Sequence, residues 1–303
     1  MPRARESTLR ETAASGGLQA LEVGFVLVLL VVVLVWSYWP TINGLIYDWQ
    51  NDANYSAGQL VPLAALYLLW HKRRALAKCR VAPCGWGIAV ILLAQAGWAF
   101  GLLFYFKSAE RYSLALTVAG IVLLVGGRQV FHAVRWILLF LFLMVPLPGR
   151  IHNLISGPLQ DLAIRGAVFV LELAGVAAAR EGNVIMLNGA VPVAVAEACS
   201  GLRMLTAFVI VAAVLAYVVS RPRWQKLVLI ISSIPVAILC NIVRVVVTAL
   251  LFQAAGSEMA ERFFHDFAGL TMMPVAVLLL LGELWIMSRL IVEDQETRVV
   301  ATL

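Results

Sequence analysis

The chain has 303 residues, of which 62% are hydrophobic and 13% charged, and its mean hydropathy is +0.91. About a quarter of the residues of a soluble domain are charged, so this composition excludes a soluble globular protein and predicts an all-α polytopic membrane protein. The formal net charge of +6 does not indicate nucleic-acid binding, because excess Lys and Arg in a membrane protein gather in cytoplasmic loops and set its orientation.

Eight apolar runs are predicted to form membrane-spanning helices, with flanking residues completing the two shortest, 59–70 and 136–148. The runs lie near 20–39, 59–70, 84–106, 113–127, 136–148, 201–219, 227–251 and 270–288. No cleavable signal peptide is expected before the first run, because arginines precede it and no small-residue cleavage site follows. We therefore expect a cytoplasmic N-terminal tail (1–19), a single transmembrane domain (20–288) and a cytoplasmic C-terminal tail (289–303).

Basic residues cluster between alternate runs. The clusters HKRRALAKCR (71–80) and RPRWQK (221–226) are the strongest, and the positive-inside rule places both in the cytoplasm. The N-terminus then lies inside, and the ends of the helices that carry few basic residues face outward.

Residues 158–179 are apolar enough to compete as a further span. They contain Asp161, Arg165 and Glu172, and the first two can pair across one turn of a helix. A span here would move the second basic cluster to the outside. We therefore predict an amphipathic or partly inserted helix on the outer face.

The next segment carries two turn signals, Gly182–Asn183 and Asn188–Gly189, around short β-type runs. They predict a small β-hairpin on the outer face. The hairpin leads into AEACSGLRML (196–205), which places Cys199 just before a long apolar helix. Cys199 is thus either a small residue at a helix start or a nucleophile.

The predicted topology brings three chemically distinct residues to the outer boundary of the membrane. Cys199 lies at the outer end of one helix, Arg244 lies in the outer half of the next, and His265 lies in the outer loop that follows. An arginine on an otherwise apolar membrane helix usually faces a polar cavity and marks function. His152 also falls outside in this topology, whereas His71 and His132 fall inside.

These residue types together suggest acyl transfer through a thioester. A thiolate is favoured beside cations and at a helix N-terminus, which suits Cys199. His265 can take the thiol proton and later give a proton to a leaving amine. Arg244 can stabilise the oxyanion of the tetrahedral intermediate. No metal or organic cofactor is expected, because the cysteines show no metal spacing and no nucleotide loop is present.

At these positions the chain resembles the exosortase family of bacterial membrane cysteine transpeptidases, which are related to archaeosortases. The resemblance rests on EACSGLR (197–203), NIVR (241–244), His265 followed by Gly269, DANYSAGQLVPLAALYLLWHKRR (52–74) and REGNVIMLNGA, which ends at Ala190. It covers about residues 25 to 288. The cysteine and arginine motifs are specific in combination, whereas either alone would be weak.

The resemblance implies a cysteine peptidase or transpeptidase in the bacterial inner membrane, with its active site facing the periplasm. Its substrates would be secreted proteins that carry a C-terminal sorting tail of the PEP-CTERM type, and exopolysaccharide machinery is a further expected partner. The family's catalytic residues carry over to Cys199, Arg244 and His265. One departure is visible, because Ala57–Gly58 stands where the family often has a His-Gly pair.

Three further residues are candidates for supporting roles. Arg203 lies one helical turn after Cys199, where it would either orient the substrate and favour the thiolate or form a structural ion pair with Glu197. Asn241 lies one turn before Arg244, where a structural role and a role at the site are equally open. Two noncatalytic functions also remain, namely a transport subunit for exopolysaccharide export and a scaffold for its assembly complex.

Overall fold

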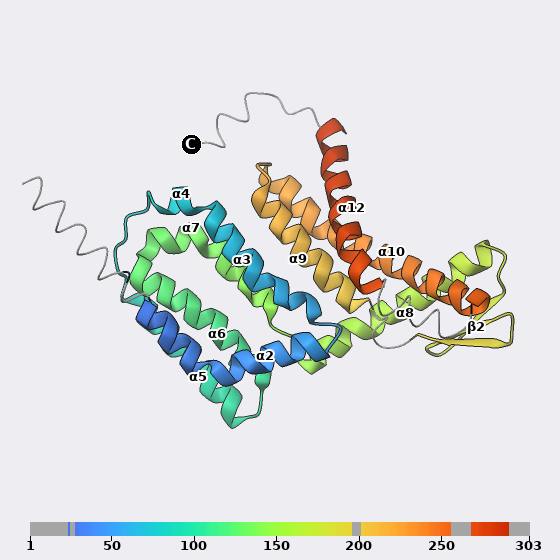
Figure 1. The fold of residues 1–303 in the computed structure, drawn as a ribbon, viewed down its shortest axis with the longest axis horizontal. Helices are drawn as coiled ribbons and strands as arrows, with labels where there is room; N and C mark the ends of the chain where they lie inside the picture. Colours follow the sequence, from blue (N-terminus) through green and yellow to red (C-terminus); the bar gives the residue numbers. More distant parts are fainter. Residues whose placement is uncertain (1–23, 25–27, 196–200, 256–267, 291–303) are drawn as a thin grey trace, which may run out of the picture. The chain divides into compact units, whose positions relative to one another are not determined.

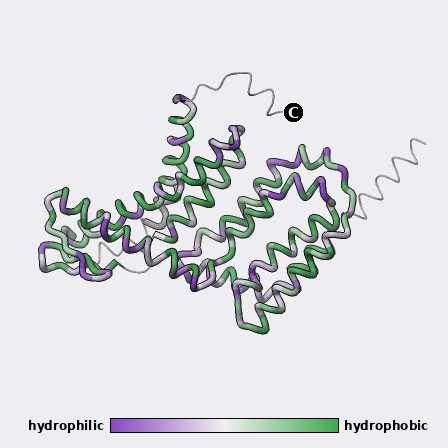
Figure 2. Tube along the Cα trace, turned by 180° about the vertical axis from the view of Figure 1, so that it is seen from behind, coloured by the Kyte–Doolittle hydropathy of each residue, from purple (hydrophilic) through white to green (hydrophobic). Residues whose placement is uncertain are grey.

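The computed structural model describes residues 24, 28–195, 201–255 and 268–290, which are mostly helical (Figure 1). The chain divides into two compact units. The first comprises Met1–Tyr47 and Arg74–Leu138, and the second comprises Asp48–Arg73 and Leu139–Leu303. Apolar residues occupy most of the length of the helices (Figure 2), as the predicted membrane location requires.

The first unit is built around the helices α5 (Trp86–Leu103) and α6 (Lys107–Ile121). Glycines let the chain approach closely here, because a Cβ on Gly87 would lie 2.4 Å from the Leu124 nitrogen and one on Gly120 would lie 2.6 Å from Ile91 Cγ1. Small residues are the usual means of close packing between membrane helices. The other elements that lie wholly or mostly in this unit are a helix over Val28–Ser37, α2 (Trp39–Asn51), α4 (Arg73–Leu76), η2 (Val122–Gly126) and α7 (Gly127–Phe140).

A buried polar network joins the helices of the first unit. The Tyr38 hydroxyl, on a side chain that is 2% exposed, lies 2.9 Å from Thr117 Oγ1. It also accepts hydrogen bonds from Gln95 Nε2 at 3.1 Å and Ser113 Oγ at 3.2 Å. A hydroxyl without partners would be costly inside a membrane protein, so the network both satisfies Tyr38 and ties the helices together.

In the second unit, α9 (Leu202–Val218), α10 (Arg223–Ala255) and α12 (Ala268–Leu290) pack against one another (Figure 1). Cys240 packs beside the buried Met204 and Phe208, which agrees with a packing role for this thiol. Ser232 Oγ on α10 donates a 2.7 Å hydrogen bond to Glu283 Oε2 on α12. The remaining helices of this unit are η1 (Ser56–Gln59), α3 (Leu60–His71), η3 (Leu141–Met144) and α8 (Gly149–Leu173).

A small antiparallel sheet follows α8 in the order β1 (Ala178–Glu181), β2 (Val184–Leu187) and β3 (Val191–Ala194). The predicted hairpin is confirmed as β1 and β2, and the second turn adds a third strand. Both turns need the left-handed backbone region, with φ of 63° at Gly182, 52° at Asn188 and 68° at Gly189. Glycine and asparagine are the residues that adopt it most readily.

The sheet packs on α8 and on the C-terminal part of α10. Its buried side chains form one core with residues of these two helices. The members of this core are Ile164, Ala167, Leu171, Ala178, Ile185, Leu187, Val193, Val195, Val245, Val246 and Ala249.

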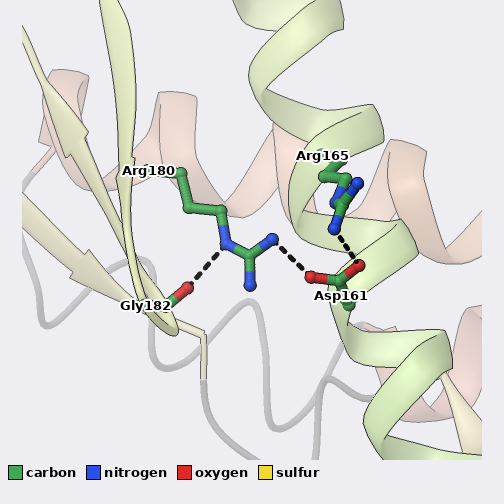
Figure 3. A network of polar contacts seen from close by, with 4 residues as sticks. All are labelled: Asp161, Arg165, Arg180 and Gly182. Carbon is green, nitrogen blue, oxygen red and sulfur yellow. Dashed lines mark hydrogen bonds and ion pairs between the residues drawn. The ribbon is translucent and has the colours of Figure 1, made fainter.

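Polar contacts fasten the sheet to α8 as well (Figure 3). Asp161 pairs with Arg165 four residues later at 2.9 Å, as predicted, and also binds the Arg180 guanidinium on β1. Arg180 Nε donates to the Gly182 carbonyl at 2.8 Å. Beyond β3, Gln160 Nε2 donates to the Val195 carbonyl at 2.9 Å. The charged groups are exposed and contribute little stability, but together these contacts fix the register of the sheet along the helix.

The prediction of eight membrane spans is not confirmed. Four described helical runs are long and apolar enough to cross a membrane, or five if the pair Val28–Ser37 and Trp39–Asn51, bent by 69°, is one span. The four runs are Trp86–Leu103, Lys107–Met144, Gly149–Leu173 and Arg223–Ala255. The expected span 113–127 and most of the expected span 136–148 fall inside the single run Lys107–Met144. The expected span 59–70 is α3, whose 12 residues reach only about 18 Å.

The sheet bears on whether residues 158–179 lie within the membrane. This segment belongs to α8, which by length and composition could cross a membrane, but its second half packs on the sheet. Open sheet edges do not occur in lipid-exposed hydrocarbon, because unpaired backbone groups there cost several kcal/mol each. Residues 179–181 of the edge strand β1 are exposed. The packing therefore places only the second half of α8 beside the sheet, which is compatible with the predicted amphipathic or partly inserted helix.

Candidate active site

The predicted site residues divide into two groups. Arg244 and Asn241 lie on α10 and are buried, with exposed fractions of 4% and 2%. Arg203 lies in the first turn of α9 and is half-buried. Cys199, Glu197 and His265 lie outside the described residues, so their predicted roles remain predictions.

The described residues on either side of 196–200 are both anchored in the second unit. On one side, the Val195 amide donates to the Asn183 carbonyl at 2.9 Å and its carbonyl accepts from Gln160. On the other side, Gly201 lies directly before α9 and its carbonyl accepts the first helical hydrogen bond, from Leu205, at 2.8 Å. In the sequence, Cys199 thus lies between residues that are anchored on both sides.

Gly201, directly before α9, lies close to Asn241 on α10. Its φ is +85°, and a Cβ built on it would lie 2.8 Å from Asn241 Nδ2 and 3.2 Å from Asn241 Cγ. Only glycine avoids both the unfavourable backbone region and the clash. The second residue after Cys199 is thus fixed against Asn241, one helical turn from Arg244.

Arg244 lies at a change of environment along α10. Toward the N-terminus, α10 packs through Ala237 and Cys240 on α9, and directly beyond Arg244 the residues Val245 and Val246 enter the core under the sheet. The 33 residues of α10 span about 50 Å, whereas the hydrocarbon is about 30 Å thick. Arg244 is thus a buried cation at the boundary between these two packing regions of α10.

A third group of residues, Asn54, Tyr55 and His152, lies beside α9 and has no role predicted from the sequence. Thr206 Oγ1 lies 3.4 Å from the Asn54 carbonyl, and η1 packs on α9. The next residue, Tyr55, places its hydroxyl 2.6 Å from His152 Nδ1 at the start of α8. The two residues are 97 positions apart, so no local pattern connects them. The only signal available was that both fall on the outer side of the predicted topology.

The departure at Ala57–Gly58 is explained by packing. Ala57 is 5% exposed, and a Cβ on Gly58 would lie 2.7 Å from Trp49 Nε1 and 3.0 Å from the Met144 carbonyl. Trp49 Nε1 itself donates to that carbonyl at 3.0 Å. The pair therefore serves a tight turn beside η3 in this chain.

One comparison bears on the identity of this arrangement. Residues 49–282, well over half of the chain, match the family model described as transmembrane exosortase (Exosortase_EpsH). The chain belongs to the transmembrane exosortase family. No curated relative and no solved structure matches it. The matched region contains the Gly201–Asn241 approach and the sheet.

The described part of the candidate site of this exosortase places the buried cation of Arg244 one helical turn from Asn241. Arg244 supplies a planar set of donors that can hold a developing oxyanion. Cys199 lies three residues before α9 in the sequence, and a helix N-terminus favours a thiolate. Among the described residues, no group of three or more His, Cys, Asp or Glu side chains is placed to hold a metal ion.

The Gly201 contact leads to a test by substitution. Gly201→Ala is expected to lower the thermal midpoint of the detergent-solubilised protein by more than Gly182→Ala does. Both positions have positive φ, which costs an alanine roughly 1–2 kcal/mol, but a Cβ at Gly182 meets nothing within 4 Å whereas one at Gly201 meets Asn241. Equal shifts for the two variants would show that the close approach to Asn241 does not constrain the fold.

Proposed function

We propose that this exosortase is a membrane-embedded cysteine transpeptidase that cleaves C-terminal sorting tails of secreted proteins through a thioester on Cys199. The single observation that carries the proposal is the fixed approach of Gly201 to Asn241. It ties the residues that follow Cys199 to the helix that carries the buried Arg244, which are the parts a thioester enzyme must keep together.

The proposed reaction has two halves. In the first, the Cys199 proton passes to His265, and the sulfur forms a bond with the carbonyl carbon of the scissile peptide. Arg244 stabilises the negative oxygen of the tetrahedral intermediate. The C–N bond then breaks, and the proton on His265 goes to the leaving amine. In the second half, a nucleophile attacks the thioester and frees the Cys199 sulfur.

The proposed location is the bacterial inner membrane, with the site at the periplasmic side. The sheet supports a site at the membrane surface, because the unpaired backbone groups at its open edge cannot lie in lipid. The chain leads from this sheet directly into the Cys199 segment. The basic cluster 71–80 begins at the C-terminal end of α3, and the cluster 221–226 follows the C-terminal end of α9, the helix that begins after the Cys199 segment in the sequence. Both clusters suit the cytoplasm. The part of a sorting tail that lies on the periplasmic side of its transmembrane helix would then reach the site.

The orientation leads to a labelling prediction. In a chain whose four native cysteines are replaced by alanine, Glu181→Cys on β1 is expected to react with a membrane-impermeant thiol reagent added to intact cells, since the reagent crosses the outer membrane but not the inner one. Arg74→Cys, which is also exposed, is the matched control and is expected to react only after the inner membrane is opened. If Arg74→Cys reacts in intact cells before Glu181→Cys does, the orientation is the reverse of the proposed one.

Activity is tested by expressing the protein together with a secreted reporter that carries a C-terminal sorting tail. Cys199→Ala is expected to abolish the size shift of the reporter on a gel, because it removes the sulfur that forms the thioester in the proposed reaction. Cys240→Ala is the matched control, since this thiol packs between α9 and α10, and it is expected to process the reporter normally. Normal processing by Cys199→Ala would refute the nucleophile.

Arg244 is tested by a change that keeps its charge. Arg244→Lys is expected to slow processing by about a hundredfold or more, the usual cost of losing an oxyanion donor, because lysine lacks the planar fork of donors. Arg165→Lys, at an exposed ion pair on α8, is the control and is expected to leave the rate unchanged. Wild-type processing by Arg244→Lys would reduce Arg244 to a generic positive charge.

A further inference from the structure

Two lysines and a tyrosine gather at one end of the helices of the second unit. Lys72 directly follows α3, Tyr217 lies in the last turn of α9, and Lys226 lies in the first turn of α10. Both α3 and α10 pack on α9. Lys72 Nζ lies 5.3 Å from the centroid of the Tyr217 ring, which is within the range of a cation–π contact. The charge of Lys72 also acts on Lys226, so the two ammonium groups lie within electrostatic range of each other.

Lys226 carries its charge in an unfavourable place. Its side chain is half-buried, and burial deprives a charge of its hydration. It lies at the N-terminal end of a 33-residue helix, where the helix dipole favours anions over cations, and Lys72 adds like-charge repulsion. Within the described part of the chain, no acidic side chain lies within ion-pair distance of Lys226. An anion from outside the chain would offset all three costs.

The Tyr217 hydroxyl indicates which kind of anion fits. Its oxygen is buried and has no hydrogen-bond partner among the described residues, although a buried hydroxyl normally has one. A hydroxyl and two ammonium groups can all donate hydrogen bonds. A phosphate group offers several charged oxygens that accept such bonds, and lysine is a common phosphate ligand. Phosphate therefore matches the donors of this cluster.

The surroundings of the cluster favour the phosphate of a lipid. Trp70 and Trp224 each lie two residues from one of the lysines, and their side chains are 59% and 48% exposed. Exposed tryptophans on membrane helices mark the level of the lipid head groups. Farther along α10, Leu227 and Ile231 are exposed apolar residues that acyl chains can cover.

We propose that Lys72, Tyr217 and Lys226 form a binding site for the phosphate of an anionic phospholipid. A zwitterionic head group brings its own ammonium group, which the two lysines repel, so the site favours an anionic head group such as that of phosphatidylglycerol. In the proposed orientation the site faces the cytoplasmic leaflet, where basic sites between membrane helices bind anionic head groups. The inference does not rest on the chemistry proposed for Cys199.

The test measures the phosphatidylglycerol that stays bound to the purified full chain, by native mass spectrometry, after release from nanodiscs of phosphatidylcholine with a small fraction of phosphatidylglycerol. The wild type is expected to retain phosphatidylglycerol in preference to phosphatidylcholine. Lys226→Gln is expected to weaken this binding roughly fivefold, the effect of about one lysine at an anionic head group. Lys78→Gln removes an exposed charge from the basic cluster 71–80 and is the matched control with wild-type binding. Equal losses in the two variants would overturn the inference, because binding would then follow net charge alone.

Tyr217→Phe distinguishes a built site from general attraction to a charged membrane, because it removes one hydroxyl and no charge. It is expected to weaken phosphatidylglycerol binding severalfold, since a hydrogen bond to a charged acceptor is lost. Tyr105→Phe changes a side chain that is 92% exposed and is the matched control with unchanged binding. Wild-type binding by Tyr217→Phe would overturn the inference.

The lipid and the free ion are separated by thermal unfolding of the protein in detergent. Added phosphatidylglycerol is expected to raise the thermal midpoint, whereas inorganic phosphate at the same concentration is expected to leave it unchanged. Equal stabilisation by the two would overturn the assignment to a lipid and make the ligand a free phosphate ion.

A further measurement uses the unaltered chain, so it does not depend on the folding of any variant. A phosphatidylglycerol analogue with a photoreactive head group is expected to crosslink mainly to the peptides that contain Lys72 or Lys226. Crosslinks spread evenly over the other basic segments, such as 128–135, would contradict a specific site.

Discussion

The close approach of Gly201 to Asn241 is the constraint on which the site depends. Two helices that pack along a membrane normally keep their backbones apart by the width of their side chains. Here the absence of a Cβ and a left-handed φ of +85° bring the backbone before α9 against an amide on α10. Because Arg244 lies one turn further on the same helix, this contact fixes the residue directly before α9 one helical turn from the cation.

The sheet complements this contact from the other side. It is too small to be stable alone, and it buries its apolar face on α8 and α10. Through the two hydrogen bonds of Val195 it also holds the chain that enters the Cys199 segment. The sheet therefore anchors the residue that precedes the Cys199 segment and packs on the part of α10 beyond Arg244.

Prediction from sequence succeeded where a local pattern was sufficient. The runs 201–219 and 227–251 are α9 and α10, and the turn residues around 182 and 188 produced the expected strands, since apolar length and left-handed turns are encoded by neighbouring residues. The predicted number of spans was not confirmed, because hydropathy measures apolar character and does not show that α3 ends after 12 residues. The Tyr55–His152 pair could not be found, since its members are 97 positions apart and meet only through the fold.

The central claim is that a thioester forms on Cys199. The most direct measurement is to trap the purified protein with a sorting-tail peptide, digest it and locate the acyl group by mass spectrometry. The account predicts an adduct on Cys199 that hydroxylamine removes, as it removes thioesters, and no adduct on Cys79, Cys84 or Cys240. Cleavage of the peptide without an adduct on Cys199, or with the acyl group on another residue, would contradict it.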